Sequence, residues 1–146
     1  MHHTIARKLN LLLVDDDPSI VRLLTHIVER RLGDKLSVCG LTDAAEAIDW
    51  LERNCCDILV SDINMPDVDG LEMLRHAKQR NAWTQVIFIT AHSTWEKLTE
   101  AVEYGASDYL LKPIDQDDFV SLLSQQYVRC ARWQCAVLGT LEAAVG

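Results

Sequence analysis

The sequence lacks a hydrophobic run long enough to cross a membrane. A spanning helix needs roughly 18–20 consecutive apolar residues, and no stretch of the 146 residues approaches that length. The N-terminal residues 1–10 also lack the apolar core of a signal peptide. The absence of both features predicts a cytoplasmic protein that does not enter a membrane.

Basic residues are too few for the chain to attract polyanions. The sequence has 14 lysines and arginines against 22 aspartates and glutamates, which gives a formal net charge of −8. A surface of this charge repels the phosphate backbone of nucleic acids. We therefore expect this segment to bind neither nucleic acid nor a membrane surface.

The cysteines lack the spacing that indicates a zinc site. There are five of them, an odd number, and no two form a C-x-x-C pair. The pattern predicts buried or free thiols in a reducing compartment, at Cys39, Cys55, Cys56, Cys130 and Cys135.

What the sequence does contain is a regular alternation of short apolar runs with helical patterns. The apolar runs predict five strands, at residues 9–14, 36–39, 57–61, 85–90 and 108–111. Between them, and after the last, apolar residues recur at helical spacing, which predicts five helices. With 146 residues and neither an internal repeat nor a low-complexity linker, the chain fits one domain.

Several helix ends and buried faces are predicted from local residues. Proline suits the first turn of a helix, glycine suits its end, and aspartate or threonine suits the cap. In the fourth helix a capping box at 93–96 marks the start, and Leu98, Ala101 and Val102 are expected to face inward. The other expected boundaries are Pro18 and Gly33 for the first helix, Thr42 or Asp43 for the second and Asp115 for the fifth.

Strict alternation of strands and helices predicts an α/β fold with a parallel sheet covered on both faces. Right-handed crossovers and a single core make a doubly wound sheet the expected solution. In such sheets ligands bind beyond the carboxyl ends of the strands. The residues leaving those ends include Asp15 and Asp16 after the first strand, Asp62 after the third, Thr90 after the fourth and Lys112 after the fifth.

This set of side chains predicts metal-assisted phosphoryl chemistry. Crowded carboxylates raise one another's pKa, and a hard divalent cation such as Mg²⁺ removes that penalty. Beside such an ion one carboxylate can attack phosphorus, while an ammonium and a hydroxyl complete the shell around the phosphoryl group.

Four motifs resemble the receiver domains of two-component response regulators, of which the chemotaxis regulator is the best-known relative. They are Leu-Val-Asp-Asp-Asp at 13–17, Ser-Asp-Ile-Asn-Met-Pro-Asp-Val-Asp-Gly at 61–70, Ile-Thr-Ala at 89–91 and Leu-Lys-Pro at 111–113. The resemblance covers about residues 8–126. It implies a flavodoxin-like (βα)5 three-layer sandwich, with a five-stranded parallel sheet in the strand order 2-1-3-4-5.

The resemblance also implies a role for each site residue. Asp62 would be the phosphoacceptor, which receives its phosphoryl group from the phosphohistidine of a sensor histidine kinase or a histidine phosphotransfer protein. Mg²⁺ (or Mn²⁺) would be held by Asp16, Asp62 and the backbone carbonyl of Asn64, with Asp15 acting through water. Lys112 and Thr90 would bind the phosphoryl group, and Tyr109 would turn inward when Thr90 moves. Two side chains would influence how fast the phosphoryl group is hydrolysed, those of Asn64 and His92.

Residues 127–146 exceed what a receiver domain needs, so we divide the chain into a receiver domain at 1–126 and a helical extension at 127–146. A stripe at alternating four- and three-residue steps continues the fifth helix, through Leu123, Tyr127, Cys130, Gln134, Val137 and Leu141. It leaves two alternatives, a dimerising coil or stalk toward an output domain, and a frayed terminal helix packed on the domain. The fourth helix, fifth strand and fifth helix are a second candidate surface for an output domain or a homodimer.

Two other functions compete with a phosphorylated receiver. A haloacid-dehalogenase-type phosphatase also forms an aspartyl phosphate, but it needs Asp-x-Asp after the first strand, whereas Asp62-Ile63-Asn64 follows the third. A receiver-like module that only binds partners usually lacks part of the acidic cluster or the lysine, and here both are present.

Overall fold

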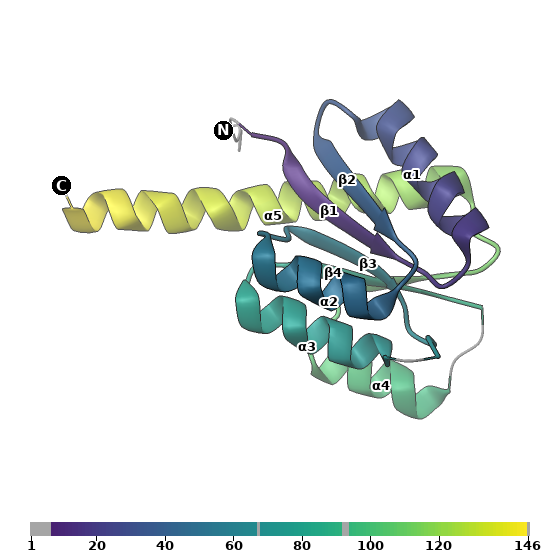
Figure 1. Cartoon of the computed structure of the whole chain (residues 1–146). Coiled ribbons are helices and arrows are strands. Elements are labelled where there is room, and N and C mark those ends of the chain that lie inside the picture. The colour runs from purple at the N-terminus through teal and green to yellow at the C-terminus, as the bar shows by residue number, and fades with distance from the viewer. Residues whose placement is uncertain (1–6, 67, 92–93, 146) are drawn as a thin grey trace.

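The computed structural model describes residues 7–66, 68–91 and 94–145, with side chains described up to residue 139. Five strands alternate with five helices (Figure 1). Their bounds are β1 (Leu9–Val14), α1 (Pro18–Leu32), β2 (Leu36–Leu41), α2 (Ala44–Arg53), β3 (Ile58–Asp62), α3 (Gly70–Arg80), β4 (Gln85–Thr90), α4 (Trp95–Glu103), β5 (Asp108–Leu111) and α5 (Gln116–Val145).

The strands form one parallel sheet in the order β2-β1-β3-β4-β5. This confirms the predicted doubly wound topology. The strand order reverses beside β1, so β1 and β3 are neighbours although β2 lies between them in the sequence. Open α/β sheets bind ligands at such a reversal, beyond the carboxyl ends of the strands.

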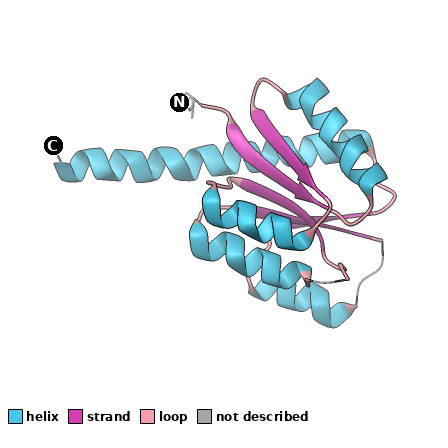
Figure 2. Ribbon diagram, in the orientation of Figure 1, coloured by secondary structure: helices cyan, strands magenta, loops and turns pink. Residues whose placement is uncertain are grey.

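Helices cover both faces of the sheet and give three layers (Figure 2). Successive strand residues point to opposite faces, so Leu11 and Leu13 of β1 pack with the core under α1 and α5. Leu12 and Val14 of the same strand pack with the core under α2, α3 and α4. The near-continuous apolar sequence of β1 is thereby explained, because every side chain from Leu11 to Val14 is buried.

Aspartate side chains cap the N-termini of three helices. The side chain of Asp17 accepts a hydrogen bond from Ser19 N at 2.9 Å, and Asp43 accepts from Ala45 N at 2.9 Å. Asp69 caps α3 in the same way. Each carboxylate satisfies a backbone N–H that has no partner within the helix. Asp43, and not Thr42, is therefore the cap of α2.

Some predicted details of the elements are wrong. β3 begins at Ile58, one residue later than expected, and β2 continues to Leu41. The fourth helix is capped by Thr94, the second residue of the predicted capping box, whose hydroxyl accepts from Lys97 N at 3.2 Å. The first residue of that box, Ser93, lies outside the described residues. Val102 was expected to face inward but is 73% exposed, because α4 turns only Ala101 fully into the core.

The fifth helix runs without interruption from Gln116 to Val145 and projects beyond the sheet (Figure 1). The first part of the predicted stripe packs on the domain itself, since Leu123 and Cys130 are fully buried. Further along, Val137 is exposed. Among the described residues no helix, α5 included, has the length and apolarity needed to cross a membrane.

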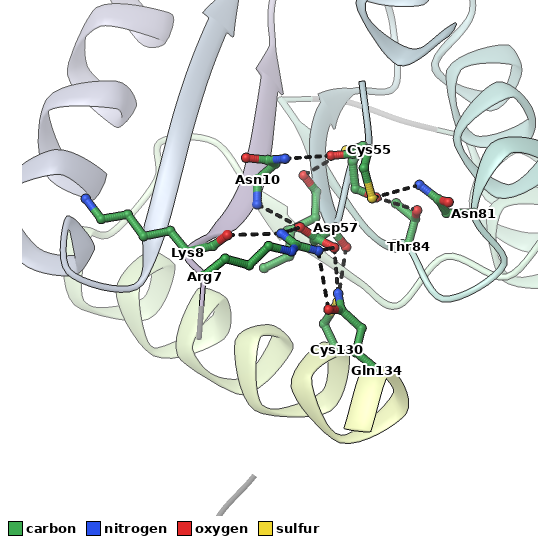
Figure 3. Close-up of polar contacts among 11 residues, drawn as sticks. Arg7, Lys8, Asn10, Cys55, Asp57, Asn81, Thr84, Cys130 and Gln134 are labelled. Carbon is green, nitrogen blue, oxygen red and sulfur yellow. Dashed lines mark hydrogen bonds and ion pairs between the residues drawn. The ribbon is translucent and has the colours of Figure 1, made fainter. Parts of the chain in front are cut away.

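A polar cluster holds the start of the extension against the sheet (Figure 3). Its centre is Asp57, a fully buried carboxylate just before β3. Arg7 donates to it from both terminal nitrogens, at 2.9 and 3.1 Å, and Gln134 of α5 donates from Nε2 at 2.6 Å. The backbone N of Asn10 adds a fourth bond at 2.8 Å. We call Arg7, Asp57 and Gln134 the anchor cluster.

Candidate functional site

Three carboxylates meet at the carboxyl edge of the sheet. Asp15 and Asp16 follow β1, and Asp62 is the last residue of β3. Because β1 and β3 are parallel neighbours, their ends bring these residues together, and one carboxylate oxygen of each lies within 4.8 Å of the others. Asp15 is fully buried and Asp62 is 6% exposed, whereas Asp16 faces solvent.

Lys112 joins the acidic cluster from the end of β5. Its Nζ forms ion pairs with Asp15 Oδ2 at 2.8 Å and with Asp62 Oδ2 at 3.0 Å. Partial burial by itself lowers the pKa of Lys112, but the hydrogen bonds and charges of the two aspartates outweigh it, and the net shift is upward. The lysine therefore stays charged and offsets part of the negative charge. The Lys112–Pro113 peptide bond is cis.

The pKa of Asp16 responds both to its partial desolvation and to the neighbouring carboxylates. Desolvation, followed by repulsion from Asp15 and Asp62, raises the pKa of Asp16 above its ordinary value. A carboxylate with a raised pKa beside other carboxylates favours binding a cation. Carboxylate oxygens are the donors that Mg²⁺ prefers, so the residues present fit the metal that the resemblance implies.

Asn64 and Thr90 lie beside Asp62. The backbone N of Asn64 donates to Asp62 Oδ1 at 2.9 Å, which fixes the carboxylate at the end of its strand. The side-chain Nδ2 of Asn64 faces Thr90 Oγ1 at 3.5 Å. Thr90 is fully buried at the last position of β4. Both residues thus lie at the same edge of the sheet as Asp62.

Tyr109, another predicted site residue, lies apart from this arrangement. Tyr109 is 53% exposed on β5, where it lines an apolar groove with Leu98 and Val102 of α4. His92 lies outside the described residues.

One residue near the site was missed by the sequence analysis. Lys97, in the first turn of α4, donates from Nζ to Asn64 Oδ1 at 2.8 Å. No motif includes this lysine, and its separation of 33 residues from Asn64 has no local signal. Only the packing of α4 beside the loop after β3 brings the two together.

A model of the response regulator receiver domain matches residues 11–124, which is most of the chain. The chain belongs to the response regulator receiver family. It is a phosphoacceptor-type signalling domain, and neither a phosphatase nor a purely binding module is favoured by the match.

Relatives of known sequence agree with this assignment. The DNA-binding transcriptional regulator NtrC of Klebsiella pneumoniae is 41% identical over 114 residues, which cover 77% of this chain and 24% of the relative. The two-component response regulator ORR26 of rice is 33% identical over 119 residues, covering 82% of this chain and 20% of the relative. The receiver chain thus spans about a quarter or less of the length of these relatives.

Solved receiver structures share the fold. The CheY-like receiver domain protein of Methanospirillum hungatei superposes with a TM-score of 0.80 at 23% identity, covering 86% of this chain and 98% of that one. The receiver domain of an HD domain-containing protein from Pseudomonas fluorescens gives a TM-score of 0.75 at 25% identity, with coverage of 82% and 94%. Both matches support the receiver fold derived from the strand order.

Proposed function

We propose that Asp62 is the phosphoacceptor of this receiver domain. The observation that carries the proposal is its position: Asp62 is nearly buried, at the carboxyl end of β3, between two further carboxylates and the ammonium of Lys112. Asp15 shares both the acidic cluster and the contact with Lys112, but its side chain is fully buried, whereas Asp62 keeps some exposure to solvent.

In the proposed reaction a carboxylate oxygen of Asp62 attacks the phosphorus of a phosphohistidine. The new P–O bond forms as the P–N bond breaks, and the electron pair of that bond returns to the imidazole of the partner. The transferred phosphoryl group spreads charge over its oxygens, so catalysis consists mainly of positioning and charge stabilisation. Lys112, already 3.0 Å from Asp62, supplies a positive charge at that point.

Mg²⁺ or Mn²⁺ is the proposed cofactor. Asp16 and Asp62 would supply carboxylate oxygens, Asn64 its backbone carbonyl, and Asp15 would act through a water. When bound, the ion offsets the charge of the phosphoryl oxygens and of the carboxylates. The raised pKa of Asp16 supports this assignment, because desolvation and then repulsion from Asp15 and Asp62 cause it, and a bound cation would relieve that repulsion.

The proposed switch runs from Thr90 to the surface of α4 and β5. Thr90 would hydrogen-bond the phosphoryl group, and Tyr109 would follow it from its exposed position toward the sheet. This movement would remodel the groove that Tyr109 lines with Leu98 and Val102, and thereby bias the domain between two states. His92 and Asn64 are the proposed modulators of phosphoryl lifetime.

The proposed partners are a sensor histidine kinase or a histidine phosphotransfer protein, and an output domain. The relative of Klebsiella pneumoniae is named a DNA-binding transcriptional regulator and is about four times as long as the matched region. An output domain could follow the receiver unit at 1–126 through the helical extension at 127–146. Cys130 and Gln134 already contact the domain, so a homodimer through the extension would use later residues such as Val137.

Intact mass spectrometry after incubation with acetyl phosphate tests the proposal. We expect the mass of one phosphoryl group to be gained in the presence of Mg²⁺ and not after addition of EDTA. Proteolytic fragmentation should place the added group on the peptide that contains Asp62. The proposal would be overturned if neither acetyl phosphate nor a panel of phosphorylated histidine kinases transferred a phosphoryl group to the chain.

A further inference from the structure

A contact between α4 and the loop after β3 bears on how long the phosphoryl group persists. Lys97 is partly buried in the first turn of α4, and its backbone N is held by the capping hydroxyl of Thr94 at 3.2 Å. Its side chain reaches 33 residues back in the sequence to Asn64, with Nζ 2.8 Å from Oδ1. The ammonium thus ends beside a residue that adjoins the phosphoacceptor.

The chemistry of this contact decides which way the Asn64 amide faces. An ammonium can only donate hydrogen bonds, so it must meet the oxygen of the amide and not the nitrogen. With Oδ1 turned to Lys97, Nδ2 is turned to Thr90 Oγ1, at 3.5 Å. The amide therefore presents N–H donors toward the phosphoryl side and its acceptor toward α4.

The orientation matters because hydrolysis of an acyl phosphate requires an attacking water. A side chain that accepts a hydrogen bond from that water directs the water's lone pair toward the phosphorus, whereas an N–H donor bonds to the water oxygen and occupies one of its lone pairs. An N–H donor instead suits the oxygens of the phosphoryl group itself. The observed orientation favours holding the phosphoryl group over hydrolysing it.

We infer that Lys97 is a positioning residue which, by fixing the Asn64 amide with its oxygen away from the site, slows loss of the phosphoryl group from Asp62. The inference rests on the proposed role of Asp62 and concerns the lifetime of the product, not its formation. Lys97 acts through Asn64 and, in the part of the chain that the structure describes, forms no hydrogen bond or ion pair with Asp62. It links the start of α4, part of the proposed output surface, to the chemistry of the site.

Dephosphorylation kinetics of Lys97→Met test the inference. The protein is phosphorylated with acetyl phosphate and Mg²⁺, the donor is removed, and the remaining phosphoprotein is followed by intact mass. Without the lysine the amide can turn its oxygen to the site, so we expect phosphoryl loss to be roughly three- to tenfold faster, the scale of one hydrogen bond. Lys97→Arg keeps a donor at this place and should retain the slow rate of phosphoryl loss. Lys8→Met is the control, because it removes a lysine that is exposed and outside the site.

A double-mutant cycle separates action through Asn64 from a general effect of charge. Lys97→Met should not change the rate when Asn64 is already alanine, because there is no amide left to orient. An undiminished effect in that background overturns the inference, as does an unchanged rate in Lys97→Met alone. A wild-type protein that takes up no phosphoryl group overturns the proposed function itself, which distinguishes the two failures.

Nuclear magnetic resonance of the unphosphorylated protein gives a readout that needs no phosphoryl group. The side-chain amide protons of Asn64 should show cross-relaxation to Thr90 in the wild-type protein and in Lys97→Arg. Loss of these signals in Lys97→Met supports the inference. The same signals in all three proteins would show that the lysine does not orient the amide.

Discussion

Two buried aspartates five positions apart show opposite uses of the same side chain. Asp57 immediately precedes β3 and Asp62 ends it. Asp57 receives four hydrogen bonds, from the two terminal nitrogens of Arg7, from Gln134 and from the backbone of Asn10. Asp62 instead lies among other carboxylates and shares the single ammonium of Lys112 with Asp15.

The difference shows that the surroundings of a buried carboxylate distinguish a structural aspartate from a functional one. A buried carboxylate is tolerated where donors satisfy it, and the anchor cluster satisfies Asp57 fully by contacts within the chain. Around Asp62, three carboxylates outnumber the ammonium of Lys112 and keep surplus negative charge. Desolvation, followed by repulsion from Asp15 and Asp62, raises the pKa of Asp16. That surplus is suited to a cation and a phosphoryl group, neither of which the chain itself supplies.

The largest expected effect distinguishes the two aspartates by phosphorylation. Asp62→Asn removes the carboxylate that we propose as the nucleophile, so we expect no phosphoryl uptake from acetyl phosphate with Mg²⁺, measured by intact mass. Asp57→Asn is the matched control, because it makes the same change at the other end of the strand. It should still be phosphorylated, and equal loss in both variants would contradict the comparison.

In their effect on the free energy of unfolding, the two aspartates should rank the other way, with Asp57 more important than Asp62. Asp57→Ala leaves the donors of Arg7, Gln134 and Asn10 without their acceptor, so we expect the free energy of unfolding to fall by about 3 kcal/mol. Asp62→Ala relieves repulsion among the carboxylates and should change stability by less than about 1 kcal/mol. Urea denaturation of the two variants measures both values, and a greater loss in Asp62→Ala would break the comparison.

Removing the ammonium of Lys112 from beside Asp62 should affect phosphoryl transfer more than folding. Lys112→Met takes the positive charge from beside Asp62, so we expect phosphoryl transfer to slow at least about tenfold. The initial rate of phosphoprotein formation from acetyl phosphate measures this effect. Lys8→Met, an exposed lysine remote from the cluster, should transfer at the wild-type rate.

A smaller effect is expected where the anchor cluster meets the helical extension. Gln134→Ala removes the 2.6 Å bond to Asp57, which should cost about 1 kcal/mol of stability. Hydrogen exchange should quicken in α5 near residue 134 and not around Asp62. Gln125→Ala changes an exposed residue of the same helix and serves as the control. Unchanged exchange in Gln134→Ala would show that the anchor does not hold the extension.

The last effect is confined to alkaline pH and is absent near neutral pH. Burial, with a further contribution from the charge of Asp57, raises the pKa of Cys130 from 9.0 to about 12. Above pH 9 the thiol of the unfolded chain loses its proton while the folded one keeps it. Stability is therefore lost as the pH rises from 9 toward 12, by at most about 1.4 kcal/mol per unit. Urea denaturation across this range should show a shallower decline in Cys130→Ala, and equal slopes would contradict the assignment.

The sequence by itself determined the five strands, their parallel arrangement and the edge at which Asp15, Asp62, Thr90 and Lys112 gather, while the order of the strands came from the resemblance to receiver domains. This was possible because burial on two faces leaves a continuous apolar run, and because parallel strands end at one edge whatever their detailed packing. Boundaries were less certain, as the start of β3 and the cap of α4 show, since neighbouring residues of similar chemistry compete for the same role.

Only the tertiary structure decided which polar side chains meet. Arg7, Asp57 and Gln134 come from three distant parts of the chain, and Lys97 meets Asn64 across 33 residues. The local sequence does not predict contacts of this kind, because they depend on how the helices pack on the sheet. The same packing turned Cys130 inward and left Val102 in solvent. Hydrophobic periodicity and turn residues determine the strands and helices locally. Which groups pair with the buried charges is decided only when the helices and the sheet have packed together.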